Sequence, residues 1–140
     1  MSFTEKLRKL ANESNDRQNK IKKNFCKKLS SYYINEILIV ENLIKHVTLC
    51  ATIGEYECDI SYLLNNLPGY YELYEEAIKA KCEKEFNDWY ELMIIKIARS
   101  FCKETEMIYC PCGSKCNKGN VHCFEHRIFV SWSCVKIIIN

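Results

Sequence analysis

The spacing of apolar residues predicts a helical arm at the start of the chain. Apolar residues recur there at helical intervals in two groups, separated by an almost wholly polar stretch at 11–20: Phe3, Leu7 and Leu10, then Ile21, Phe25 and Leu29. Ser2 or Thr4 can cap the start of this helix. We expect the helix to break or hang free between Asn12 and Lys20, because that stretch offers nothing to bury. A stripe this narrow suits docking on a partner better than burial in a core.

Two further helical patterns follow the arm. Apolar positions between Tyr33 and Leu49 cover more than one face, which predicts a buried helix over Ser31–Thr52 that ends before Gly54. A short helix at 62–66 and a turn at 68–69 come next. The pattern from Tyr70 to about Lys103 then predicts one long helix with an acidic, solvent-exposed side.

Alternation of apolar and polar residues predicts the strands. It occurs over 55–60 and again over 126–134. A short extended run at 107–112 and the segment 126–134 bracket a Gly/Asn/Lys-rich loop at 113–125. The fold class we expect is α+β, with two core helices packed on a small antiparallel sheet. Residues 1–30 form the basic helical arm, and residues 31–140 form one compact domain that includes the Cys-rich loop 110–126.

Length and composition allow one ordinary domain. The chain has 140 residues, of which 48% are hydrophobic, enough for a real core. No apolar segment of about 7–15 residues follows the charged start, so we expect no secretion by a signal peptide. The most apolar stretch, Ile34–Cys50, is interrupted by polar residues, and we therefore expect no membrane insertion.

The charge is segregated along the chain. Residues 1–30 carry nine basic and three acidic side chains, a net charge of +6, whereas residues 31–105 carry seven and thirteen, a net charge of −6. A basic arm beside an acidic body favours self-association or docking on an acidic partner, and a solvated helix face without a partner is the equal alternative. Four lysines are the candidate interaction residues: Lys22, Lys23, Lys27 and Lys28. Nucleic-acid binding through them would be weak and sensitive to salt, because the chain as a whole is not strongly basic.

The C-terminal third contains the candidate chemistry. Four cysteines and two histidines fall between positions 110 and 126, which is typical of a metal site or a disulfide framework. For zinc, the spacing favours Cys112 and Cys116 as one pair of ligands and Cys123 and His126 as the other. Cys110 and His122 are the alternatives. Such a site would be structural, since four protein ligands leave no position for water.

Disulfides are the other interpretation of the same residues. The candidate cysteines all lie in the last third of the chain: Cys110, Cys112, Cys116, Cys123 and Cys134. Five cysteines lie there and five in the helical part, so complete pairing within one chain needs at least one bridge between the two parts. The sequence leaves zinc and disulfides open.

A resemblance to known proteins adds a biological setting. The helix that ends in Ala51-x-x-Gly54-Glu55, the following strand and the segment Ile128-Phe-Val-Ser-Trp132 resemble a layout in small structural proteins of phages and large DNA viruses. The resemblance covers about a third of the chain, excludes the cysteine loop and brings no catalytic residues. It implies a protein that works by association, in a virion or the cytoplasm of an infected cell.

The sequence contains no phosphate loop, dinucleotide fingerprint, serine elbow or Cys-x-x-Cys motif. We therefore expect no enzyme. The function predicted is that of a structural or assembly protein, such as a minor component associated with a virion, stabilised by cysteine cross-links or zinc. The alternative is a zinc-stabilised adaptor or nucleic-acid-binding module in a reducing cytosol.

Overall fold

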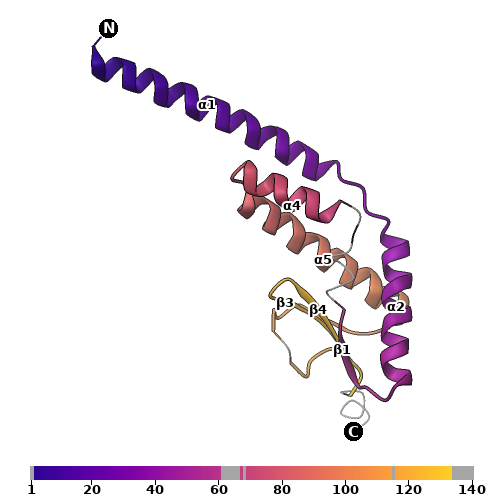
Figure 1. Ribbon diagram of the computed structural model, residues 1–140. Helices are drawn as coiled ribbons and strands as arrows, with labels where there is room; N and C mark the ends of the chain where they lie inside the picture. Colours follow the sequence, from indigo (N-terminus) through magenta and orange to yellow (C-terminus); the bar gives the residue numbers. More distant parts are fainter. Residues whose placement is uncertain (1, 61–66, 68, 115, 134–140) are drawn as a thin grey trace. The chain divides into compact units, whose positions relative to one another are not determined.

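The α+β fold class is confirmed by the computed structural model, which describes residues 2–60, 67, 69–114 and 116–133. Over these residues the chain forms four helices and a four-stranded sheet (Figure 1). The helices are α1 (Phe3–Ser30), α2 (Glu36–Thr52), α4 (Tyr70–Lys79) and α5 (Glu83–Thr105). The strands are β1 (Glu57–Asp59), β2 (Tyr109–Cys110), β3 (Val121–Phe124) and β4 (Arg127–Ser131).

Contacts divide the chain into two compact units. The first contains residues 1–33 and 71–88, and the second contains residues 34–70 and 89–140. The sequence-based division into 1–30 and 31–140 therefore differs, because the predicted arm shares its contacts with residues 71–88. In the first unit, Phe25 and Leu29 of α1 are buried, as are Leu73 and Ala77 of α4. The buried apolar residues of α1 therefore both lie in the second half of the helix.

Helix α1 runs without the expected break between Asn12 and Lys20. Ser2 caps its start: the Ser2 hydroxyl accepts a hydrogen bond from the Glu5 amide, and the Glu5 side chain accepts one from the Ser2 amide. This capping box satisfies two amides that a helix start otherwise leaves unpaired. Polar residues alone do not break a helix, and the Gln18 side chain donates to the Ala80 carbonyl at 2.6 Å.

The long helix expected from Tyr70 is two helices. Lys81 has a φ of +56°, the left-handed conformation that ends a helix, and the Cys82 amide donates to the Ala77 carbonyl at 2.8 Å. Helix α5 then restarts, with the Phe86 amide donating to the Cys82 carbonyl. Helix α2 also begins later than expected, because Asn35 caps it. The predicted short helix at 62–66 lies outside the described residues.

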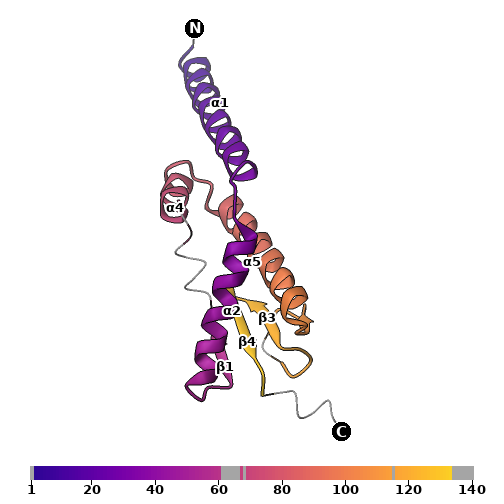
Figure 2. The same cartoon turned by 90° about the vertical axis from the view of Figure 1, so that its right-hand side faces the viewer.

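The sheet of the second unit has the order β1-β4-β3-β2. Strand β4 is antiparallel to both β1 and β3, but β2 runs parallel to β3, so the sheet is mixed and not antiparallel as expected. Strand β3 occupies part of the predicted loop. It joins β4 through Glu125 and His126, whose φ angles of +49° and +61° form a two-residue hairpin turn. Figure 2 shows β3 and β4 side by side.

The two faces of the sheet have different roles. Cys58, Val121, Ile128 and Val130 belong to one buried cluster with apolar residues of α2 and α5. Neighbouring side chains in a strand point to opposite faces of the sheet. The strand residues next to those of the buried cluster therefore lie on the other face, here called the outer face. His122 is one of these, and its neighbour across the parallel pair is Cys110. The outer face therefore carries two residues that can bind a metal ion.

Candidate metal centre

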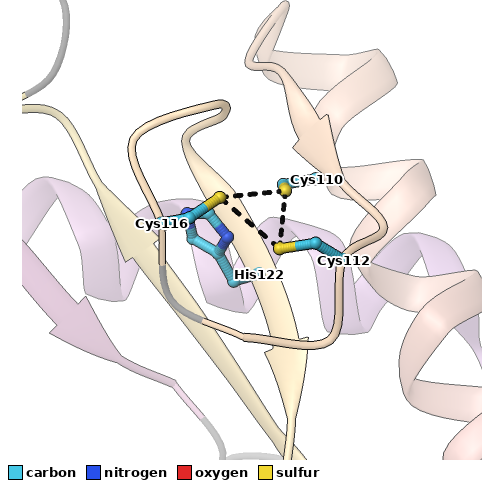
Figure 3. Close-up of side chains that lie close together, drawn as sticks. All are labelled: Cys110, Cys112, Cys116 and His122. Atoms are coloured by element: carbon cyan, nitrogen blue, oxygen red, sulfur yellow. Dashed lines mark hydrogen bonds between the residues drawn. The ribbon is translucent and has the colours of Figure 1, made fainter.

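Cys110, Cys112, Cys116 and His122 come together at one end of the sheet. Their potential ligand atoms, one from each residue, all lie within 4.8 Å of one another. Strands β2 and β3 supply Cys110 and His122, and the connecting loop supplies the other two residues (Figure 3). The parallel pairing of β2 with β3 therefore builds half of the group, and the loop supplies the other half.

The three sulfur atoms form a nearly equilateral triangle. The Sγ atom of Cys110 lies 3.1 Å from that of Cys112 and 3.3 Å from that of Cys116, and the remaining edge is 3.4 Å. A disulfide bond is much shorter, about 2.05 Å. All nine cysteines that the structure describes are free thiols. The sulfur atoms are thus close enough to bind the same metal ion and are not bonded to one another.

His122 presents a nitrogen that has no hydrogen-bond partner among the described residues. Its side chain is 1% exposed, and its Nε2 atom lies 3.0 Å from the Gly119 carbonyl oxygen. Because a carbonyl can only accept, Nε2 carries the proton in this hydrogen bond, and Nδ1 keeps a free lone pair. Nδ1 is buried and makes no hydrogen bond to any described residue. A buried nitrogen without a partner is costly, and a metal ion would satisfy it.

The end of the loop is fixed to the sheet. The Asn120 side chain accepts a hydrogen bond from the Ile108 amide at 3.1 Å and donates one to the Ser131 carbonyl at 3.0 Å. Gly119 packs so closely that a Cβ atom there would lie 3.0 Å from both the Ile108 carbonyl oxygen and the Cys110 Cβ atom. The return of the chain from Cys116 to β3 is therefore held tightly against β2.

Hydrogen bonds prepare one thiol for metal binding. The Ser114 hydroxyl, assisted by Cys110, lowers the pKa of the Cys112 thiol to about 6. The same contact with Cys112 raises the pKa of Cys110 to about 11. Since metals bind the thiolate and not the thiol, Cys112 is ready to bind near neutral pH, whereas Cys110 must lose its proton as the metal enters.

The four residues that come together in the structure differ from the four zinc ligands that the sequence spacing favours. Cys112 and Cys116 are in both, and the two alternatives Cys110 and His122 complete the observed group. Cys123 is not part of it, because β-strand alternation turns Cys123 to the helix-facing side, where its Sγ atom lies 3.9 Å from the Ile94 carbonyl oxygen.

His126 is also outside the group. It lies exposed in the β3–β4 turn, and its ring centroid is 5.8 Å from that of Tyr90. The strand that separates His122 from this turn was not predicted, and it explains why a histidine four residues further along cannot reach the loop. The last disulfide candidate, Cys134, lies outside the described residues.

The four candidate interaction lysines are all exposed on α1. Two of them form ion pairs within the first unit: Lys22 with Glu85 at 2.9 Å and Lys28 with Glu76 at 2.5 Å. Among the described residues, Lys23 and Lys27 form no ion pair. Part of the positive charge of α1 is therefore paired with carboxylates of the same unit.

Comparison with known proteins found no matching family model, no significantly similar curated protein and no significantly similar solved structure. Among the described residues, no helix is both long enough and apolar enough to span a membrane.

Proposed function

We propose that the protein is a non-enzymatic interaction protein whose C-terminal loop is held by one zinc ion. The ligands are Cys110, Cys112, Cys116 and His122 through Nδ1. The observations that carry this proposal are three sulfur atoms and one His122 ring nitrogen within 4.8 Å of one another, and the buried Nδ1 atom of that ring, which makes no hydrogen bond to any described residue. Thiolates with an imidazole favour zinc over magnesium or calcium, which prefer oxygen.

The distances support this assignment. With zinc–sulfur bonds of about 2.3 Å, the sulfur atoms of a tetrahedral site lie about 3.8 Å apart. The observed edges of 3.1–3.4 Å are shorter than this by about 0.4–0.7 Å, so the loop would have to open slightly around the ion. The hydrogen bond from His122 to the Gly119 carbonyl would fix the ring and its tautomer, as in many metal sites.

A site of this kind acts on folding and not on chemistry. Four protein ligands fill a tetrahedral zinc ion, so no position is open for water or substrate. Because the loop spans Pro111 to Asn120, zinc binding would order the segment between β2 and β3 and stabilise their short pairing. A rigid loop displayed on a small sheet suits recognition of another molecule.

The partner we propose is a protein and not a nucleic acid. Lys22 and Lys28, two of the four lysines that would meet phosphates, are already paired with carboxylates of the same unit. A place in a virus particle stays a prediction from the sequence resemblance. A salt-dependent mobility shift on random DNA at micromolar protein would argue for the nucleic-acid alternative.

The test distinguishes the zinc ligands that come together in the structure from those that the sequence spacing favours. Native mass spectrometry and elemental analysis would count zinc in the wild type and in two variants, Cys110→Ser and Cys123→Ser. We expect Cys110→Ser to lose one zinc ion per chain and Cys123→Ser to lose none. Loss of zinc in Cys123→Ser alone would reject the proposed ligands. A mass about two units lower per cysteine pair, without metal, would establish disulfides instead.

A further inference from the structure

A second group of metal-binding side chains lies in the same unit, away from the loop. His46 and Cys50 are four residues apart on α2 and therefore share one face of the helix, and Cys58 belongs to β1. Their potential ligand atoms all lie within 4.8 Å of one another. Spacing along the sequence gives the His46–Cys50 pair but no sign of Cys58 beside it, because the helix and the strand meet only in the folded chain.

The geometry fits a metal ion. The His46 Nε2 atom lies 3.7 Å from the Cys50 Sγ atom. In a tetrahedral zinc site, a nitrogen and a sulfur ligand are about 3.6 Å apart, given bond lengths of about 2.05 and 2.3 Å. Cys50 and Cys58 are 9% and 7% exposed, and His46 is half-buried. The group is thus screened from solvent on the cysteine side and accessible on the histidine side.

The Cys58 thiol is protonated when no metal is present. Burial, together with a hydrogen bond to Cys50, raises the pKa of Cys58 to about 12. A metal ion would therefore have to displace the proton from the Cys58 sulfur atom, and this proton would pass to the solvent.

We propose that His46, Cys50 and Cys58 bind a second zinc ion, with the fourth coordination position taken by water. The ion would tie the last turns of α2 to the edge strand β1. The two sites share no ligand. Cys58 lies on the helix-facing side of the sheet, opposite Val130, whereas His122 lies on the outer face. Each site can therefore be removed without changing the ligands of the other.

The experiment counts zinc in variants of the full chain. In Cys110→Ser, which lacks a ligand of the first site, we expect one zinc ion per chain by native mass spectrometry. Adding Cys50→Ser should remove that ion, whereas adding Cys102→Ser, another buried cysteine, should leave it in place. No bound zinc in Cys110→Ser, or one zinc ion that survives Cys50→Ser, would overturn the second site.

A measurement on the unmutated chain covers the case in which a variant does not fold. The protein is loaded with ¹¹³Cd²⁺, and the metal is correlated with nearby protons by NMR. We expect one cadmium resonance coupled to the β-protons of Cys50 and Cys58 and a separate one coupled to those of Cys110. If no resonance couples to Cys50 and Cys58, the second site is wrong, whatever the result for the first. If the Cys110 resonance alone is missing, the proposed function fails and the second site stands.

Discussion

Replacing Gly119 with alanine tests how tightly the proposed zinc loop must close. A Cβ atom at this position would lie 3.0 Å from the Ile108 carbonyl oxygen and 3.0 Å from the Cys110 Cβ atom, whereas ordinary contacts begin near 3.4 Å. The loop or β2 must therefore shift by about 0.4 Å, and crowding of this kind costs about 1–3 kcal/mol. The shift acts on Cys110, a proposed ligand, and on the carbonyl that holds His122.

The cost should appear mainly as weaker zinc binding. A cost of 1–3 kcal/mol that falls on the zinc-bound loop alone corresponds to roughly 5- to 140-fold lower affinity. Competition with a chromophoric chelator measures this affinity. Asn117→Ala, an exposed change in the same loop, is the control and should stay within about twofold of the wild type. If Gly119→Ala binds zinc as tightly as Asn117→Ala and is equally stable to urea, the reasoning about this contact is wrong.

Three further outcomes are expected. Leu43→Ala, at a fully buried position of α2, should lower the free energy of unfolding by about 2–5 kcal/mol in urea denaturation. Leu38→Ala, on the exposed side of the same helix, should change it by less than about 0.5 kcal/mol. Equal effects of the two variants would contradict the described packing. In metal-free protein at pH 7, Cys112 should be alkylated far faster than Cys102, because their thiol pKa values are about 6 and about 11, and the Cys112 rate should fall as the pH drops below 6; mass spectrometry of peptides would show the order. While free zinc, set by a chelator, stays above the dissociation constant, each tenfold decrease in its concentration should lower the free energy of unfolding by about 1.4 kcal/mol per bound ion. An unfolding midpoint that does not change when the chelator is added would argue against a structural metal.

The interaction of the basic helix with its own unit bears on the docking hypothesis. Lys22 and Lys28 were predicted to meet a partner, but each pairs with a glutamate within the first unit. Both pairs are partly exposed, so salt will weaken them. A partner that docks on α1 would therefore compete with these glutamates, or use the apolar residues Phe3, Leu7 and Leu10, which remain exposed.

Local pattern was sufficient for most helices and for part of the sheet. The capping residue Ser2, the helix end at Gly54 and the alternation around Cys58 were all readable, because each depends on residues within a few positions. The split at Lys81 was not readable, since a lysine in the left-handed conformation leaves no mark in the pattern of apolar residues. Strand β3 was missed for a similar reason: its hairpin turn is Glu125-His126, without the glycine or asparagine that usually signals one.

The sequence by itself determined the chemistry of this protein: an α+β chain with a dense group of thiols and imidazoles near its C-terminus. Which of those side chains meet was decided by the tertiary structure. Strand alternation separates His122 from Cys123, and the parallel pairing of β2 with β3 brings His122 beside Cys110. The meeting of α2 with β1 adds His46, Cys50 and Cys58. Ligand choice depends on contacts between distant segments, and spacing along a chain records only which residues are near in sequence.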